Sequence, residues 1–188
     1  PQGKKPVKTM LFPTGQRKEA HRLMRKELEA GRQAYVVYPL VEPSEKIDLQ
    51  AAIEAVEQLR EECAPFRIGL LHGRLPSREK QMVMAQFKGK EIDVLVATTV
   101  VEVGLDVHNA TVMLIEHAER FGLAQLHQLR GRVGRGLYQG YCVLIHGLGK
   151  IPPYSHQIPL KLESSRMSLD EIRRSSQGEA FSRSTARR

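Results

Sequence analysis

The sequence predicts an α/β domain in which a parallel sheet is covered by helices on both faces. Three observations lead to this fold class. Short apolar runs alternate with stretches of helical periodicity over residues 34–146. The clearest runs are nearly continuous, as expected for strands buried on both faces. The connections between them are long enough to hold a helix, as in βαβ units. We therefore expect a doubly wound, mainly parallel sheet, followed by a poorly structured C-terminal tail.

Residues 1–33 are predicted to form a strand and a basic helix that lead into this domain. Residues 7–12 are apolar and bounded by prolines, which favours a short strand. Residues 16–30 have helical periodicity, with Met24 and Leu28 on one face and a glycine after the last turn. Lysines and arginines occupy the other face. We expect that face to be mainly solvated rather than to bind a ligand.

The strands expected next are residues 34–41, 66–71, 93–97, 111–115 and 141–145, and the helices between them are residues 44–62, 77–88 and 124–130. In the first of these helices Ile53 belongs to the apolar positions at helical spacing. In the second, Ser77 is predicted to be the N-cap. Met82, Ala85 and Phe87 are predicted to face the core of the domain formed by residues 34–146.

Length and composition restrict the class of protein. A chain of 188 residues can form one packed domain plus a tail. It has no apolar run long enough to span a membrane, and its first residues lack the apolar segment of a signal peptide and do not begin with Met, so we expect a fragment. Its two cysteines, Cys63 and Cys142, form neither a disulfide framework nor a zinc-binding cluster. We expect a cytoplasmic protein with no membrane partner and no metal ligands of its own.

The net charge of +8 comes from the two ends of the chain. Residues 1–33 carry nine Lys and Arg against three Asp and Glu, and residues 147–188 carry eight against four. Residues 34–146 carry 12 against 14, so nucleic-acid binding there would require a local basic cluster. Residues 147–188 hold eight serines and three closely spaced prolines, with few aliphatic residues at any regular spacing, and we expect them to be a divergent, flexible tail.

A local basic cluster occurs at residues 125–136. Arg130, Arg132 and Arg135 fall within six residues, and glycines lie among and after them. Guanidinium groups form forked hydrogen bonds to phosphate oxygens, and glycine lets the backbone leave a helix and approach a ligand. We interpret this stretch as the end of a helix that presents Arg132 and Arg135 to a phosphate. The alternative is a solvated helix end, where arginines interact favourably with the helix dipole.

Other polar residues follow predicted strands, where open α/β sheets bind ligands. Thr98 and Thr99 have hydroxyls that can donate to phosphate, although capping the next turn is an equal alternative for both. Asp106 has the same alternative, as a capping or turn residue. His72 has no partner at a spacing typical of metal ligands, so a structural or phosphate-contacting role is favoured over a catalytic one.

The motifs resemble the second RecA-like domain of superfamily-two helicases. Residues 128–135, Gln-Leu-Arg-Gly-Arg-Val-Gly-Arg, are similar to helicase motif VI, and residues 94–106 are similar to motif V. Residues 33–42, 44–46 and 71–74 are most similar to RecG-like DNA helicases, with Mfd-like translocases next. The resemblance covers about residues 5–146. It implies a RecA-like fold and an ATP-dependent helicase that acts on branched DNA in recombination and repair.

The resemblance implies an ATP site shared with another domain. Arg132 and Arg135 would reach the γ-phosphate, Gln128 would help to order this catalytic site, and Gly104 and Asp106 would lie at the nucleotide. The chain has no Gly-x-x-x-x-Gly-Lys-Ser/Thr phosphate loop. ATP with Mg²⁺ would therefore be held mainly by the first RecA-like domain, and we expect the chain alone to be inactive.

The resemblance also implies contacts with DNA. Thr98 and Thr99 would touch the phosphate backbone, and His72 and Arg74 are weaker candidates for the same role. The partners implied are branched DNA and the N-terminal RecA-like and DNA-wedge domains of the same protein. Two alternatives remain. One is a non-enzymatic, degenerate RecA-like module that binds DNA or protein, and the other is the corresponding domain of an Mfd-like transcription-repair translocase.

Overall fold

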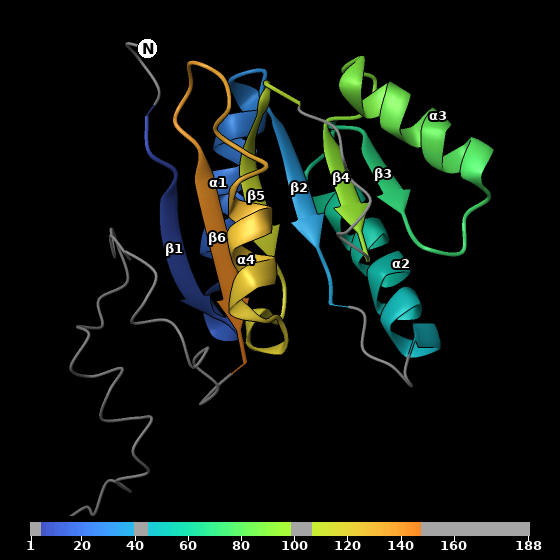
Figure 1. Ribbon diagram of the computed structural model, residues 1–188, viewed down its shortest axis with the longest axis horizontal. Coiled ribbons are helices and arrows are strands. Elements are labelled where there is room, and N and C mark those ends of the chain that lie inside the picture. The colour runs from blue at the N-terminus through green and yellow to red at the C-terminus, as the bar shows by residue number, and fades with distance from the viewer. Residues whose placement is uncertain (1–4, 40–44, 99–106, 148–188) are drawn as a thin grey trace, which may run out of the picture.

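Parallel strands with helices on both sides make up the domain, as predicted (Figure 1). The computed structural model describes residues 5–39, 45–98 and 107–147. Within them the sheet has the order β1-β6-β5-β2-β4-β3. The strands are β1 (Lys8–Pro13), β2 (Gln33–Val37), β3 (Ile68–Leu71), β4 (Val94–Ala97), β5 (Ala110–Ile115) and β6 (Tyr141–His146). The helices are α1 (Arg17–Glu29), α2 (Glu45–Glu62), α3 (Ser77–Lys88) and α4 (Leu123–Arg130), with 3₁₀ turns η1 (Thr14–Gln16) and η2 (Ala118–Arg120).

The two faces of the sheet are buried under different helices. Ala34 and Val36 of β2 pack in the core cluster that contains residues of α1 and α2. Tyr35 and Val37 pack in the cluster that contains residues of α3 and α4. Successive side chains of a strand point to opposite faces, so a central strand between two helical layers must be apolar at every such position. This explains the continuous apolar runs in the sequence.

The N-terminal strand belongs to the same sheet. β1 pairs with β6 over its whole length, from Lys8 beside Tyr141 to Pro13 beside His146. β1, which precedes the predicted domain, therefore forms an edge of its sheet. The expected tail, residues 148–188, lies outside the described residues.

The predicted orientation of α3 is wrong for two of its three predicted core residues and is confirmed for Phe87. Met82 is 55% exposed and Ala85 also faces solvent, whereas Phe87 is fully buried. Residues of an α-helix are about 100° apart around its axis, so a core-facing Phe87 turns both of the others outward. The predicted cap is wrong as well. Ser77 is the first helical residue, the N-cap is Pro76, and no side chain caps the helix.

Two other predictions are corrected. Ile53 is 39% exposed because the buried stripe of α2 runs through Ala52, Val56 and Leu59, and Ile53 lies at its border. β2 ends at Val37, short of the predicted residue 41, and the proline at position 39 has no N–H to continue the pairing. Both cysteines are buried and unpaired. No helix in the described ranges is long and apolar enough to cross a membrane.

The parallel arrangement gives the sheet two distinct ends. All arrows in Figure 1 point the same way, so the carboxyl ends of the strands meet at one end of the molecule. His72, Thr98 and Glu116 directly follow β3, β4 and β5 at this carboxyl end. α4 runs in the opposite direction, so the residues after Arg130 lie at the amino end.

Candidate functional site

Residues 131–140, which we call the arginine turn, begin where α4 ends. Gly131 occupies the C-cap, and its N–H donates to the carbonyl of His127. The next N–H, of Arg132, donates to the carbonyl of Leu129 at 3.0 Å. The predicted helix end is confirmed, and the chain leaves the helix between the first and second arginines of the cluster.

The backbone of the arginine turn is held by a buried side chain and by close glycine contacts. Val133 is 2% exposed and packs in the core between the two later arginines. Gly134 has a φ of +68°, in the left-handed region that favours glycine. A Cβ atom on Gly140 would lie 2.7 Å from the Cα of Gly134, so the two limbs of the turn approach more closely than other residues allow. The turn is therefore fixed at its base.

The arginine turn also lies against the start of β5. A Cβ atom on Gly136 would lie 2.7 Å from the backbone oxygen of His108, two residues before the strand. Val107, the residue that directly follows the segment resembling motif V, lies three residues before β5. Three predicted site residues of that segment, Thr99, Gly104 and Asp106, lie outside the described residues, so their roles stay predictions.

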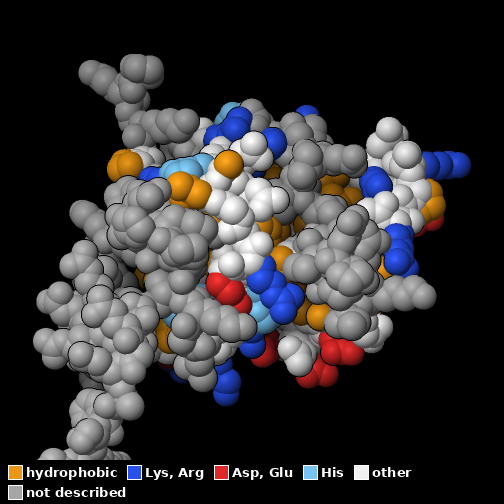
Figure 2. All heavy atoms as spheres, turned by 60° about the horizontal axis from the view of Figure 1, so that its bottom comes forward, with side chains coloured by type: hydrophobic (Ala, Val, Ile, Leu, Met, Phe, Trp, Pro, Cys, Tyr) orange, Lys and Arg blue, Asp and Glu red, His pale blue; other side chains and the backbone are white. Residues whose placement is uncertain are grey.

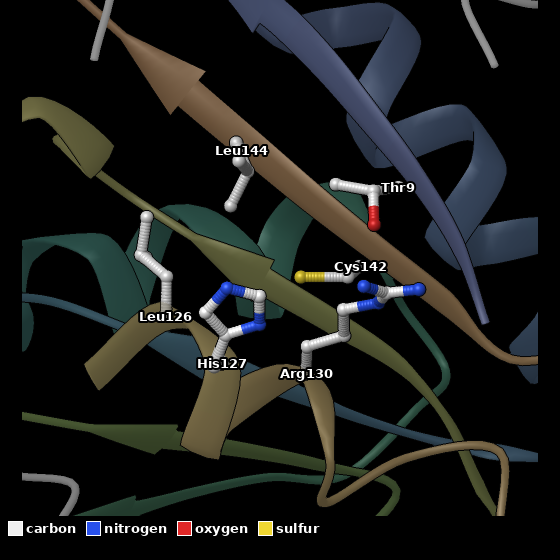
Figure 3. Close-up of a pocket in the computed structure, with 6 residues that line it drawn as sticks. All are labelled: Thr9, Leu126, His127, Arg130, Cys142 and Leu144. Carbon is white, nitrogen blue, oxygen red and sulfur yellow. The ribbon is translucent and has the colours of Figure 1, made fainter. Parts of the chain in front are cut away.

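Arg130 is directed to the sheet rather than to the arginine turn. Its Nη2 donates to the carbonyl of Val7 at 3.3 Å. It also lines a cavity of about 10 Å³ with Thr9, Cys142 and three other residues (Figure 3). A cavity of this volume holds about one water molecule and is too small for a ligand. Burial raises the pKa of the Cys142 thiol to about 12, so the thiol stays protonated at neutral pH.

Arg132 and Arg135 are the arginines that the turn itself carries. Both are partly exposed, and the Nε of Arg135 donates to the carbonyl of Gly131 at 2.8 Å. This bond connects the side chain to the start of the turn. Gln128 is exposed on α4. The three residues predicted to be catalytic thus lie within eight residues at the amino end of the sheet, on a fixed backbone.

Thr98 and His72 are brought together at the carboxyl end. The N–H of Thr98 donates to the carbonyl of Leu71 at 3.2 Å, which joins the ends of β4 and β3. Thr98 Oγ1 and His72 Nδ1 are both buried, and neither has a hydrogen-bond partner among the described residues. Burying a polar atom without a hydrogen-bond partner costs about 1–3 kcal/mol. These two atoms could therefore form favourable hydrogen bonds with a ligand that supplies a donor or an acceptor.

The protonation of His72 is set mainly by burial. Desolvation lowers the pKa of His72, and the charges of Lys80 and Arg74 lower it further. His72 is therefore neutral near pH 7 and can either donate or accept a hydrogen bond. Arg74 is exposed in the polar turn that follows β3. Thr98 is only 1% exposed, so its hydroxyl is covered in this arrangement.

The two groups of predicted site residues lie at opposite ends of the sheet. The arginine turn is at the amino end, and Thr98 and His72 are at the carboxyl end (Figure 1). Residues 99–106 join the end of β4 to the approach of β5, so one segment of the chain connects both groups. The domain therefore holds the two groups of predicted site residues at opposite ends of its sheet.

A buried ion pair at the carboxyl end was not predicted. Glu116 follows β5 and is 1% exposed. It accepts two hydrogen bonds from Arg17, from Nε and Nη2, both at 2.9 Å. Burial and the charge of Glu116 raise the pKa of Tyr38, which follows β2. A carboxylate directly after a fully apolar run is the feature of the sequence that could have indicated a buried ion pair. Its partner Arg17 is 99 positions away in the chain, so no local spacing identifies the pair.

The carboxyl end is rich in charged side chains. Figure 2 shows basic, acidic and histidine side chains gathered near the middle of this face. Arg17 also lines a cavity of about 380 Å³ with residues of α1 and α2. His21 Nδ1 and Glu62 Oε2 are 2.7 Å apart at this cavity. Within the described ranges, no group of three or more His, Cys, Asp or Glu residues is placed to hold a metal ion.

Comparison with known proteins identifies the family. Residues 16–136 match the helicase conserved C-terminal domain. The ATP-dependent DNA helicase RecG of Synechocystis is 52% identical over 146 residues, which are 77% of this chain and 18% of that protein. RecG of Thermotoga maritima is also 52% identical, over 148 residues, which are 78% of this chain and 19% of that protein. The chain thus spans about a fifth of these relatives.

The structural comparison agrees. A solved structure of RecG bound to a three-way DNA junction has a TM-score of 0.66 and 39% identity to this chain, and covers 94% of this chain and 26% of its own. This likeness confirms the RecA-like fold and the predicted resemblance to RecG-like helicases. The chain therefore belongs to the helicase conserved C-terminal domain family, in the part of it that contains the RecG-type ATP-dependent DNA helicases.

Proposed function

We propose that this chain is the second motor domain of an ATP-dependent helicase that acts on branched DNA. The observation that carries the proposal is the arginine turn. Buried Val133 and the contact between Gly134 and Gly140 fix its backbone, and Arg132 and Arg135 project from it. Guanidinium groups on a fixed backbone are suited to stabilising charge that develops on a transferred phosphoryl group, because little reorganisation is needed during the reaction.

In this proposal ATP lies between the arginine turn and the first RecA-like domain of the same protein. That domain would hold the phosphates and Mg²⁺, because the sequence of this chain has no phosphate loop. Arg132 and Arg135 would reach the γ-phosphate, and Gln128, exposed one turn earlier on α4, would help to order the site. Gly104 and Asp106 complete the nucleotide side of the proposal.

DNA would bind at the carboxyl end of the sheet. The buried Thr98 Oγ1 and His72 Nδ1 have no partner among the described residues, which makes them candidates for the phosphate backbone, with Thr99 and Arg74 beside them. Contacts with phosphates release counterions, so affinity should fall as salt increases. The segment 99–106 would couple the two ends. The further partners are the first RecA-like domain and the DNA-wedge domain of the same protein. We place the protein in the cytoplasm, where two free cysteines such as these stay reduced.

The test is ATP hydrolysis by this chain mixed with a separately produced phosphate-loop domain of a RecG-type helicase, with and without forked DNA. We expect activity only in the mixture. Arg135→Ala should lower turnover by about 10³- to 10⁵-fold, the range for an arginine supplied to a transferred phosphoryl group. This corresponds to about 4–7 kcal/mol of barrier. DNA affinity should be nearly unchanged.

Arg60→Ala is the matched control. Arg60 is exposed on α2 and bonds Glu57 one turn away, so its loss should leave turnover unchanged. An Arg135→Ala mixture as active as the wild-type mixture would refute the arginine assignment. A folded chain that supports no activity in any mixture would instead identify a non-enzymatic module.

A further inference from the structure

Tyr138 of the arginine turn stacks on a cation from another part of the chain. Tyr138 is 53% exposed and lies three residues after Arg135. The Cζ atom of Arg32 is 4.9 Å from the centre of this ring, within the range of a cation–π interaction. Arg32 lies between α1 and β2, so the stack joins the turn to an element remote in sequence.

Arg32 is itself held from the core. Its Nε and Nη2 both donate to the carboxylate of Glu27, the second at 3.2 Å. Glu27 is 4% exposed, and its Oε2 also accepts a hydrogen bond of 2.8 Å from the Thr111 hydroxyl on β5. The bonds to Glu27 raise the pKa of Arg32, so the guanidinium is always charged. A continuous chain of contacts therefore runs from β5 to the Tyr138 ring.

This chain of contacts meets the arginine turn beyond its glycine base. The two limbs approach at Gly134 and Gly140, and Gln139 Nε2 donates to the carbonyl of Pro6 at 2.7 Å. Arg135 lies between the base and Tyr138. A shift of the outer part of the turn would therefore move Arg135 directly.

We propose that Glu27, Arg32 and Tyr138 are positioning residues that orient the arginine turn toward the phosphate of ATP. This inference rests on the proposed function for its role in turnover. The buried carboxylate fixes the guanidinium, the guanidinium fixes the ring, and the ring fixes the outer part of the turn. Misplacing a catalytic group by about 1 Å can lower the rate about 10²-fold, so even a modest constraint on the turn affects catalysis.

The first experiment measures how rigidly the arginine turn is held in the absence of ATP. The observable is the rate of amide hydrogen exchange in the full 188-residue chain. Tyr138→Ala should accelerate exchange of the amides of residues 131–140 by roughly two- to fivefold, the range for an exposed cation–π contact. Tyr138→Phe keeps a ring and should exchange like the wild type. Leu137→Ala is the control, because Leu137 is 80% exposed beside Tyr138. Unchanged exchange in Tyr138→Ala, or equal acceleration in Tyr138→Phe, would overturn the proposal.

The second experiment measures ATP turnover of the same variants in the mixture with the phosphate-loop domain. Tyr138→Ala should lower kcat severalfold with little change in KM for ATP. Tyr138→Phe, which keeps the ring, should have a kcat close to that of the wild type. If Arg135→Ala lowers turnover but Tyr138→Ala does not, the inference fails and the proposed function stands. If Arg135→Ala itself has no effect, the proposed function fails, while the exchange experiment still decides whether Tyr138 holds the turn.

Discussion

The ion pair of Arg17 and Glu116 should respond unequally to loss of either partner. The Glu116 side chain is 1% exposed, whereas that of Arg17 is 40% exposed. Arg17→Met leaves a buried carboxylate without its cation, and removing one partner of a buried pair costs about 3–5 kcal/mol. Glu116→Gln leaves an arginine that can turn to water, so we expect a smaller loss of about 1.5–3 kcal/mol, the value of hydrogen bonds to a charged group. The double variant buries no charge and should be more stable than Arg17→Met alone.

Urea unfolding of the 188-residue chain, followed by circular dichroism, measures these differences. With slopes of about 1–3 kcal/mol per molar urea, a loss of 3 kcal/mol lowers the midpoint by roughly 1–3 M. Arg22→Met is the control, because Arg22 on the same helix bonds Glu19 on an exposed surface. Surface pairs contribute about 0–1 kcal/mol. The reasoning is refuted if Glu116→Gln destabilises the chain as much as Arg17→Met, or if the double variant is the least stable.

Two other predictions concern the carboxyl end of the sheet. Thr98→Val removes a buried hydroxyl that has no partner among the described residues, so the free energy of unfolding should not fall, while DNA affinity of the mixture should decrease. Thr111→Val is its control and should cost about 1 kcal/mol or more, because that hydroxyl bonds Glu27; a similar loss in Thr98→Val would contradict the prediction. The pKa of His72 is lower in the folded chain than in the unfolded chain, where it is about 6.5. The folded chain therefore keeps its full stability above this pH and loses stability as the pH falls through the folded pKa. His72→Asn should therefore flatten the fall in stability as the pH drops below about 6.5, which thermal unfolding at a series of pH values would measure. An equally steep fall in the variant would contradict this prediction.

The order and type of the elements could be predicted from the sequence because each depends on local pattern. A strand covered on both faces must be apolar at nearly every position, which is why β2 and β5 are visible as runs. The end of α4 is marked by Gly131, and its helical residues are recognised by their spacing. The sequence also predicts a phosphate-binding role for Arg132 and Arg135, because guanidinium and glycine restrict what such a stretch can do, and this role stays a prediction.

Sequence pattern was weaker where two faces of a helix are both partly apolar. α3 offers Met82 and Ala85 on one side and Met84 and Phe87 on the other. Only the volume available against the sheet decides between them, and the large Phe87 ring takes it, against Leu95 and Tyr35 among others. Serine is a residue type that commonly occupies the N-cap of a helix, but here Pro76 is the N-cap and Ser77 is already the first helical residue.

The sequence by itself determined the fold class and the order of the elements along the chain, since both follow from residues close together in the chain. The phosphate-directed role of the arginines stays a prediction from the same local pattern. The tertiary structure alone decided that β1 pairs with β6, that the arginine turn and Thr98 lie at opposite ends of the sheet, and that Glu27 reaches Tyr138 through Arg32. These are contacts between residues far apart in sequence. They depend on strand order and packing, which no local spacing encodes.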